Sequence, residues 1–120
     1  QHLRFVVDIH TKYLRRPYTP TSSHNQLGEI DFVIKKYPDG MMTNYLDALS
    51  IGSSLEMLGP FGTKYYIGKG KFSVDGRTCN YNKILLIAGG TGITPAFSVM
   101  QAVFEEGWKN LKMTLIYANK

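Results

Sequence analysis

The stretch that decides the fold is Leu-Ile-Ala-Gly-Gly-Thr-Gly-Ile-Thr-Pro at residues 86–95. An apolar run over residues 84–88 ends abruptly at the glycines, and an amphipathic segment begins at Thr94-Pro95. Thr94 suits a helix N-cap, and Pro95 suits the first helical position, where its missing N–H costs nothing. Apolar residues then recur at helical spacing and predict one packed face: Ile93, Phe97, Met100 and Phe104. The pattern predicts a buried strand, a glycine turn and the N-terminus of a helix.

A turn of this kind suits the binding of a phosphate or diphosphate, because backbone N–H groups and the positive end of a helix dipole face the same point. The residues that would approach such a ligand are Gly89, Gly90, Thr91, Gly92, Thr94 and Pro95. Proline stands where the Rossmann fingerprint has its third glycine, and no Lys-Ser/Thr pair follows as in a P-loop. Taken alone, the turn leaves open that it binds nothing.

A second motif, Arg16-Pro17-Tyr18-Thr19-Pro20, lies far upstream. The two prolines enforce an extended backbone, so the arginine, tyrosine and threonine are presented at fixed relative positions. An arginine can hold a phosphate with two hydrogen bonds, a tyrosine offers a flat face for ring stacking, and a threonine offers a hydroxyl. The alternative is an edge strand with a solvated arginine and a packed tyrosine.

Together the two motifs resemble the ferredoxin–NADP reductase superfamily, and within it NADH–cytochrome b5 reductase and the flavin-containing part of eukaryotic nitrate reductase. Further segments extend the likeness nearly end to end: Gln1-His2 and residues 31–35, 59–62, 68–72 and 117–119. The resemblance implies an antiparallel β-barrel of the six-stranded type, followed by the start of an α/β parallel-sheet nucleotide-binding domain. It implies an FAD-binding barrel domain at residues 1–80 and the first βαβ unit of an NAD(P)H-binding domain at 81–120. Family members are longer, so we expect a fragment that lacks the first barrel strands.

The periodicity of the chain predicts the individual elements. Residues 29–37 alternate as a strand, with Ile30, Phe32 and Ile34 on a core face and Val33, Lys35 and Tyr37 on a face that a ligand could cover. A short helix is expected at 41–49, packed through Met42, Tyr45, Leu46 and Leu49. Other strands are expected at 3–9, 13–19, 54–58, 63–67, 83–88 and 111–117, a tight turn at 59–62, a loop at 68–82 and a helix at 94–106.

The resemblance also implies where FAD and the nicotinamide nucleotide bind. Arg16, with Pro17 beside it, would contact the diphosphate, Tyr18 would lie against the isoalloxazine, and Thr19 would hydrogen-bond near its reactive edge. Tyr18, Thr19 and Lys35 are the expected catalytic residues. Further flavin contacts are expected from Val33, Lys35, Tyr37, Gly40, Met41, Met42, Thr43 and Thr94, and nucleotide contacts from Gly89, Gly90, Thr91, Gly92 and Pro95. An ordinary solvated role for Lys35 and core packing by Met41-Met42 are the alternatives.

The activity that the resemblance implies is hydride transfer from NAD(P)H, with NADH expected, to FAD. Single electrons would then pass to a haem protein such as cytochrome b5, or to a metal centre. A flavin-binding or docking module without turnover is the competing function. A further possibility is that the isolated fragment does not fold and has neither function. A nucleic-acid partner is not expected, because the chain lacks a stacking platform.

Composition narrows these classes only slightly. The chain has 120 residues, 43% of them hydrophobic, and a net charge of +5, which suits a diphosphate cofactor or an acidic partner. One cysteine, Cys79, excludes a disulfide framework, and the three histidines have no metal-ligand spacing. No signal peptide or membrane-spanning run is present, so a cytoplasmic location, or the cytoplasmic face of a membrane through an anchor outside this chain, is expected.

Overall fold

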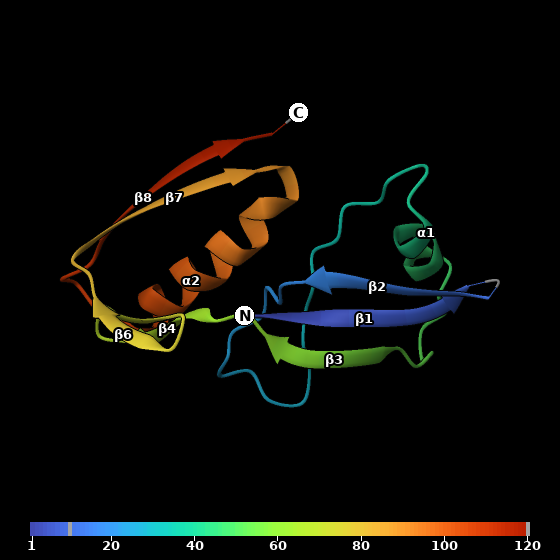
Figure 1. Cartoon of the computed structure of the whole chain (residues 1–120), viewed down its shortest axis with the longest axis horizontal. Coiled ribbons are helices and arrows are strands. Elements are labelled where there is room, and N and C mark those ends of the chain that lie inside the picture. Colours follow the sequence, from blue (N-terminus) through green and yellow to red (C-terminus); the bar gives the residue numbers. More distant parts are fainter. Residues whose placement is uncertain (10, 120) are drawn as a thin grey trace.

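The computed structural model describes residues 1–9 and 11–119, which fold into two halves that lie side by side (Figure 1). The first half contains β1 (His2–Ile9), β2 (Lys12–Tyr18), β3 (Glu56–Phe61) and the helix α1 (Met41–Asp47). The second half contains β4 (Lys64–Gly68), β5 (Lys71–Val74), β6 (Arg77–Asn80), β7 (Lys83–Gly89), the 3-10 turn η1 (Gly90–Gly92), α2 (Ile93–Glu106) and β8 (Lys112–Ala118). Two antiparallel sheets therefore precede a parallel strand pair with its helix, which confirms the expected fold class.

The sheet of the first half has the order β2-β1-β3, with both pairings antiparallel. Leu3 lies opposite Tyr18 and Phe5 lies opposite Arg16, so the strand carrying the Arg-Pro-Tyr motif is paired along its whole length. The register between β1 and β3 shifts near the start of β1, and β3 stays paired as far as Phe61. The tight turn expected at residues 59–62 was therefore placed too early, because an irregularity in the ladder bends a strand without ending it.

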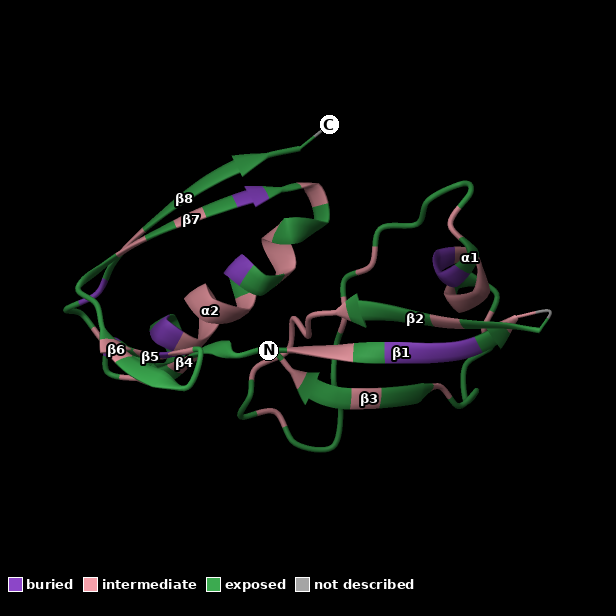
Figure 2. Cartoon of the chain, in the orientation of Figure 1, coloured by how far each residue is buried: buried purple, intermediate pink, exposed green. Residues whose placement is uncertain are grey.

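The core of the first half forms where α1 packs on this sheet. Phe5, Val7 and Met42 are buried together, and Figure 2 shows buried positions on both β1 and α1. The Phe5 ring lies 4.8 Å from the Phe32 ring, edge to face. Partly buried apolar residues complete the cluster: Ile9, Leu14, Tyr18, Phe32, Ile34, Tyr45, Leu46 and Leu55. The short helix was thus predicted correctly, although it ends at Asp47.

The segment 29–37 is extended but is not a ladder strand, which corrects the prediction. Its Asp31 bonds to a neighbouring loop, accepting from the backbone N–H of Thr21 at 2.8 Å and donating its own N–H to Ser22 at 3.1 Å. Phe32 and Ile34 still pack on the core, but Ile30 is exposed. Alternating side chains thus survive without sheet pairing, because the core contacts of alternate residues hold the backbone extended.

Residues 68–82 are also corrected, because they form the antiparallel strands β5 and β6 where a loop was expected. Asp75-Gly76 joins the two strands, and both residues have positive φ, 50° and 81°. A two-residue Asp-Gly turn of that kind is the favoured hairpin connection. The sequence signal was the dipeptide itself. It was hidden because both strands are only four residues long and mostly polar.

The strand–helix–strand unit expected from the opening motif is present. β7 and β8 pair in parallel, with Leu85 opposite Thr114 and Ile87 opposite Ile116. The helix α2 lies between this pair and the β4–β6 sheet, and it contacts β4, β7 and β8 (Figure 1). Neither α1 nor α2, the helices in residues 1–9 and 11–119, is long and apolar enough to cross a membrane.

The start of α2 differs from the prediction. The 3-10 turn η1 leads directly into the helix at Ile93, so Gly92 is the N-cap and Thr94 and Pro95 occupy the second and third helical positions. Proline is tolerated there because the N–H groups of the first turn have no acceptor inside the helix. Thr94 is therefore not the capping residue.

The packed face of α2 was predicted only in part, because Ile93 and Met100 are half-buried but the two phenylalanines are not. Phe97 and Phe104 are exposed, at 43% and 85%, whereas Ala96 and Val103 are buried. The buried positions of the helix thus carry small side chains, and the helix contacts both β7 and β4. Spacing alone identifies an apolar stripe, but it does not say which of two adjacent stripes faces a sheet.

Candidate functional site

A cavity of about 680 Å³ lies where the two sequence motifs meet. One wall comes from the end of β2, a second from the segment 33–37 and α1, and a third from the junction of η1 and α2. The sequence-predicted residues that line it are Pro17, Tyr18, Thr19, Val33, Lys35, Tyr37, Thr43, Thr91, Gly92, Thr94 and Pro95. Segments far apart in the chain thus converge on one concave site.

Tyr18 forms a wall of the cavity and is anchored from behind. Its ring centroid lies 4.6 Å from that of Phe5, at an angle of 39°. Burial raises the pKa of the Tyr18 phenol, and the positive charge of Arg16 partly opposes that shift. The phenol is therefore neutral near pH 7, and its fixed ring offers a flat surface to a bound molecule.

Arg16 stands beside this wall and is not one of the residues that line it. Its guanidinium donates to the carbonyl of Arg15 at 2.9 Å, and the side chain is exposed. The bond is local and exposed, so little is lost when the guanidinium turns to another acceptor.

The segment 33–37 contributes alternate residues to the cavity. Val33 is 69% exposed, and Lys35 and Tyr37 are also exposed, so the chain itself covers none of the three. The Lys35 ammonium lies 5.7 Å from the centroid of the Tyr37 ring. An apolar side chain, a cation and an aromatic ring therefore stand in a row, which is a suitable surface for a flat anionic ligand.

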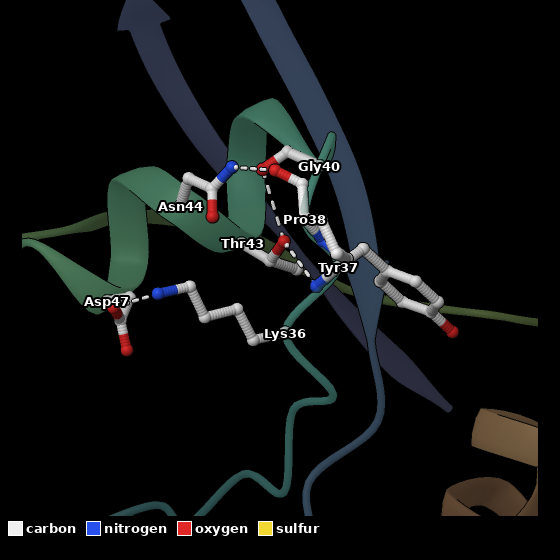
Figure 3. Close-up of polar contacts among 7 residues, drawn as sticks. All are labelled: Lys36, Tyr37, Pro38, Gly40, Thr43, Asn44 and Asp47. Atoms are coloured by element: carbon white, nitrogen blue, oxygen red, sulfur yellow. Dashed lines mark hydrogen bonds and ion pairs between the residues drawn. The ribbon is translucent and has the colours of Figure 1, made fainter.

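The start of α1 is locked by its own hydrogen bonds (Figure 3). The Thr43 hydroxyl donates to the carbonyl of Gly40 at 3.1 Å and accepts from the N–H of Tyr37 at 3.2 Å. The Asn44 amide donates to the carbonyl of Pro38 at 2.8 Å. A Cβ at Gly40 would collide with the Thr43 hydroxyl, so the turn requires glycine there. The Tyr37 ring points away from α1 in the same view.

Three predicted residues next to this turn do not line the cavity: Gly40, Met41 and Met42. Met42 is 4% exposed and belongs to the core cluster, so only its backbone is available to a ligand. Met41 is 43% exposed. Core packing, the alternative interpretation of this pair, therefore holds for Met42.

The glycines after β7 divide into two kinds. Gly90 has φ of +52°, a conformation that favours glycine. Gly89 and Gly92 have ordinary φ values, −120° and −62°, and a Cβ at either would meet nothing within 4 Å. Neither backbone conformation nor packing within the chain explains glycine at 89 and 92, so the open space beside them is suited to a ligand that approaches the backbone. Of the three, only Gly92 lines the cavity.

The junction of η1 and α2 is closed by a side-chain bond. The Thr94 hydroxyl donates to the carbonyl of Thr91 at 3.2 Å. Its oxygen keeps the capacity to accept a further hydrogen bond. Thr94 therefore fits a group with an N–H or O–H donor on the cavity side.

Sequence reasoning missed three residues that line the cavity: His2, Arg4 and Ile34. Arg4 lies opposite Pro17 in the sheet register, and its guanidinium is 4.2 Å from the centroid of the Phe61 ring. Burial, then the charges of Arg4 and the N-terminus, lower the pKa of His2. The signal that could have found His2 and Arg4 was the pairing of the first strand with the Arg-Pro-Tyr strand.

The cavity is positively charged. Among the described residues that line it, Arg4 and Lys35 carry charge at neutral pH and no carboxylate is present. A site with cations, flat ring surfaces and bare backbone glycine is suited to an anion with an aromatic part.

Comparison with known protein families gives two matches. Residues 1–66 match the oxidoreductase FAD-binding domain, and residues 86–120 match the oxidoreductase NAD-binding domain. The first covers the two cavity walls formed by β2 and the segment 33–37, and the second covers the wall formed by η1 and α2.

Individual relatives agree with these matches. The chain is 38% identical to nitrate reductase [NADH] 2 of Arabidopsis thaliana and 40% identical to nitrate reductase [NADH] 1 of Nicotiana tabacum, in each case over all of this chain and 14% of the relative. The crystal structure of the cytochrome b5 reductase domain of Ulva prolifera nitrate reductase superposes with a TM-score of 0.90 at 30% identity, over 99% of this chain and 48% of that one. The CS-b5R domains of human Ncb5or give a TM-score of 0.73 at 28% identity, over 99% of this chain and 34% of theirs.

Proposed function

Because the chain belongs to the oxidoreductase FAD-binding domain family, we propose that it is the cofactor-binding part of an NADH-dependent flavoprotein reductase. It spans about a seventh of the curated nitrate reductases that it matches, 14% of each. The activity proposed is that of a whole reductase, to which this chain would contribute the cofactor-binding part. The observation that carries it is the shared cavity, in which two walls come from the FAD-binding match and a third from the NAD-binding match.

The residues present fit FAD. The cavity has cations for a diphosphate, the anchored Tyr18 ring for a flat heterocycle, and open space at Gly92 for close backbone approach. When bound, FAD would supply the redox chemistry, taking up a hydride and giving up single electrons. The protein supplies binding, orientation and exclusion of water.

We assign the individual roles as follows. Tyr18 supports the ring system, and the Thr19 hydroxyl hydrogen-bonds at its edge. Lys35 supplies a positive charge to the cavity. The Arg16 guanidinium turns from the Arg15 carbonyl to the diphosphate. The remaining proposed flavin contacts are Pro17, Val33, Tyr37, Gly40, Met41, Met42, Thr43 and Thr94, and the proposed nucleotide contacts are Gly89, Gly90, Thr91, Gly92 and Pro95.

The proposed domain division is 1–80 and 81–120, with the β4–β6 sheet on the first side of the boundary and α2 on the second. The proposed electron acceptor is a haem protein such as cytochrome b5. The names of the relatives support this acceptor, since the similar solved structure is a cytochrome b5 reductase domain. The net charge of +5 favours association with an acidic acceptor.

The test uses the purified protein loaded with FAD. We expect flavin absorbance after gel filtration and NADH-driven reduction of ferricyanide. Lys35→Met should lower activity about tenfold or more, because it removes a cavity charge. The matched control is Lys36→Met, since Lys36 points to Asp47 on α1 instead (Figure 3).

Three outcomes are informative. Loss of activity in the Lys35 variant but not in the Lys36 variant supports the proposal. Flavin binding with no reduction by NADH favours a binding module without turnover. Failure of any flavin to bind contradicts the proposal.

A further inference from the structure

Two carboxylates at the C-terminal end of α2 tie the helix to other parts of the molecule. The first is Glu106, which accepts hydrogen bonds from the Tyr66 hydroxyl on β4 and from the backbone N–H of Lys69, the latter at 2.9 Å to each oxygen. The Tyr66 hydroxyl in turn accepts from the N–H of Gly70 at 3.2 Å. One carboxylate thus engages both β4 and the β4–β5 turn.

The second carboxylate, Glu105, engages the loop that follows the Arg-Pro-Tyr motif. The Ser23 hydroxyl donates to it at 2.6 Å and the Asn25 amide at 3.5 Å. Ser23 also accepts from the N–H of Asn25 at 3.0 Å, so the loop itself is ordered around the contact. Neighbouring residues on α2 therefore contact two different segments of the FAD-binding match.

The position of these carboxylates is unfavourable for the helix alone. The C-terminal end of a helix carries a partial negative charge, and acidic side chains there are disfavoured. The last turn of α2 has no basic residue, and the helix ends at Gly107 in the left-handed conformation, with φ of 69°. Glu105 and Glu106 are therefore explained by their contacts outside the helix. The hydrogen bonds from Tyr66 and Lys69 hold the pKa of Glu106 below its usual value.

The turn that Glu106 contacts is packed closely. A Cβ at Gly70 would lie 2.9 Å from the carbonyl oxygen of Tyr81 and 3.1 Å from the Trp108 indole nitrogen, and one at Gly68 would lie 3.1 Å from the Glu106 carboxylate. A larger residue would be crowded by Tyr81 and Trp108 at position 70 and by the Glu106 carboxylate at position 68. Close packing therefore favours glycine at both positions of this turn.

We propose that Glu105 and Glu106 are positioning residues, which together form a clamp that sets where the N-terminal end of α2 stands in the cofactor cavity. The proposal rests on the function proposed above. The opposite end of α2 supplies Thr94 and Pro95 to that cavity, and Thr91 and Gly92 precede it directly. A helix of 14 residues is about 21 Å long, so a rotation at the clamp is carried to the far end as a displacement.

Most residues proposed to hold FAD are therefore separate from the end of α2 that aligns the nucleotide with it. The FAD contacts proposed on β2 and on segment 33–37 do not involve α2, so loosening the clamp leaves them in place. Hydride transfer needs the reacting atoms within a near-attack distance, and a misplacement of about 1 Å costs up to about a hundredfold in rate. The clamp should therefore affect the rate of flavin reduction more than the affinity for FAD, whose proposed contacts, apart from Thr94, lie outside α2.

The experiment compares Glu105→Gln, Glu106→Gln and the double variant with Glu56→Gln, the same change at an exposed site on β3 away from α2. We expect FAD content to stay within about twofold of the unmodified protein. The rate of flavin reduction by NADH in single turnovers should fall about tenfold in each clamp variant. Ser23→Ala, which removes the nearer hydrogen-bond partner of Glu105, should match Glu105→Gln.

A second measurement does not depend on activity. Amide hydrogen exchange at residues 91–97 should be faster in the clamp variants than in Glu56→Gln, with residues 3–7 unchanged. Equal reduction rates in clamp and control variants would overturn the proposal. So would a loss of FAD content in parallel with the rate, which would indicate a structural role only. If the unmodified protein binds FAD but NADH does not reduce it, the proposed function fails, and the exchange result alone decides for or against the clamp.

Discussion

The apolar side chains of the β1–β3 sheet and of the parallel β7–β8 pair differ greatly in exposure. In the β1–β3 sheet, Phe5, Val6 and Val7 are 3–5% exposed. In the parallel pair of β7 and β8, Ile87 is 75% exposed and Ile116 is 54% exposed. The sequences of these two strands are nevertheless mostly apolar, as is that of β1. Parallel sheets in proteins are covered on both faces, whereas α2 covers one face of this pair. An apolar run therefore indicates a strand, but what covers it decides how much it contributes to stability.

The largest expected effect tests this contrast directly. Phe5→Ala should lower the free energy of unfolding by about 3–5 kcal/mol, since it opens a cavity among Val7, Met42 and Phe32. Ile87→Ala should change it by no more than about 0.5 kcal/mol, because that side chain is mostly in water already. Urea unfolding followed by circular dichroism gives both values. Similar losses in the two variants would mean that the β7–β8 face is covered in solution.

The glycines of the two halves give a sharper comparison. Gly40→Ala should cost about 1–3 kcal/mol, because the new methyl group collides with the Thr43 hydroxyl. Gly92→Ala should leave stability nearly unchanged, since its Cβ meets nothing, yet weaken NADH binding about tenfold, or about 1.4 kcal/mol. Thermal unfolding and equilibrium titration with NADH separate the two effects. A Gly92 variant with normal affinity would argue against close approach of the nucleotide there.

The contact of α2 with β4 and the β4–β5 turn should depend on pH. The folded state lowers the pKa of Glu106, so its contribution to stability is complete above the pKa of the unfolded chain and is lost as pH falls through the folded value. The stability difference between the unmodified protein and Glu106→Gln should therefore shrink on acidification. Urea midpoints at pH 7, 5 and 3.5 measure this. A difference that grows toward acid would contradict the depressed pKa.

The smallest expected effect concerns the exposed ion pair of the first half. The Lys36 ammonium and the Asp47 carboxylate are 2.5 Å apart, and both side chains are more than half exposed. Solvent screening limits such pairs to about 0.5 kcal/mol, so Asp47→Asn should barely move the urea midpoint. High salt should abolish even that difference. A loss above about 1 kcal/mol would indicate that the pair also fixes the C-terminal end of α1.

The sequence was most informative where one local rule acted alone. Alternation and pairing placed β1 and β2, and the glycine turn placed β7 and the helix after it. Residues of both motifs were expected to contact one ligand, FAD, and both motifs line one cavity. The nature of that ligand came from resemblance to a family, since the residues alone left the turn and the Arg-Pro-Tyr motif each open to a structural role.

The errors arose where tertiary contacts override a local pattern. Segment 29–37 alternates correctly but finds no strand partner, and the Asp75-Gly76 hairpin joins strands too polar to show periodicity. Phe97 and Phe104 outrank Ala96 in hydrophobicity, yet the smaller residue faces the strands. His2 and Arg4 were missed because they enter the cavity through strand pairing, which single-sequence spacing does not report.

The parallel pair has a practical consequence for handling the protein. Among residues 1–9 and 11–119, β7 and β8 pair only with each other, so each presents one row of unpaired backbone groups. Edge strands that are long and apolar act as templates for further strands from other molecules. Concentrated samples are therefore expected to self-associate through the unpaired edges of β7 and β8. A lysine in place of Ile116, at an exposed position, is the substitution that should keep them dispersed.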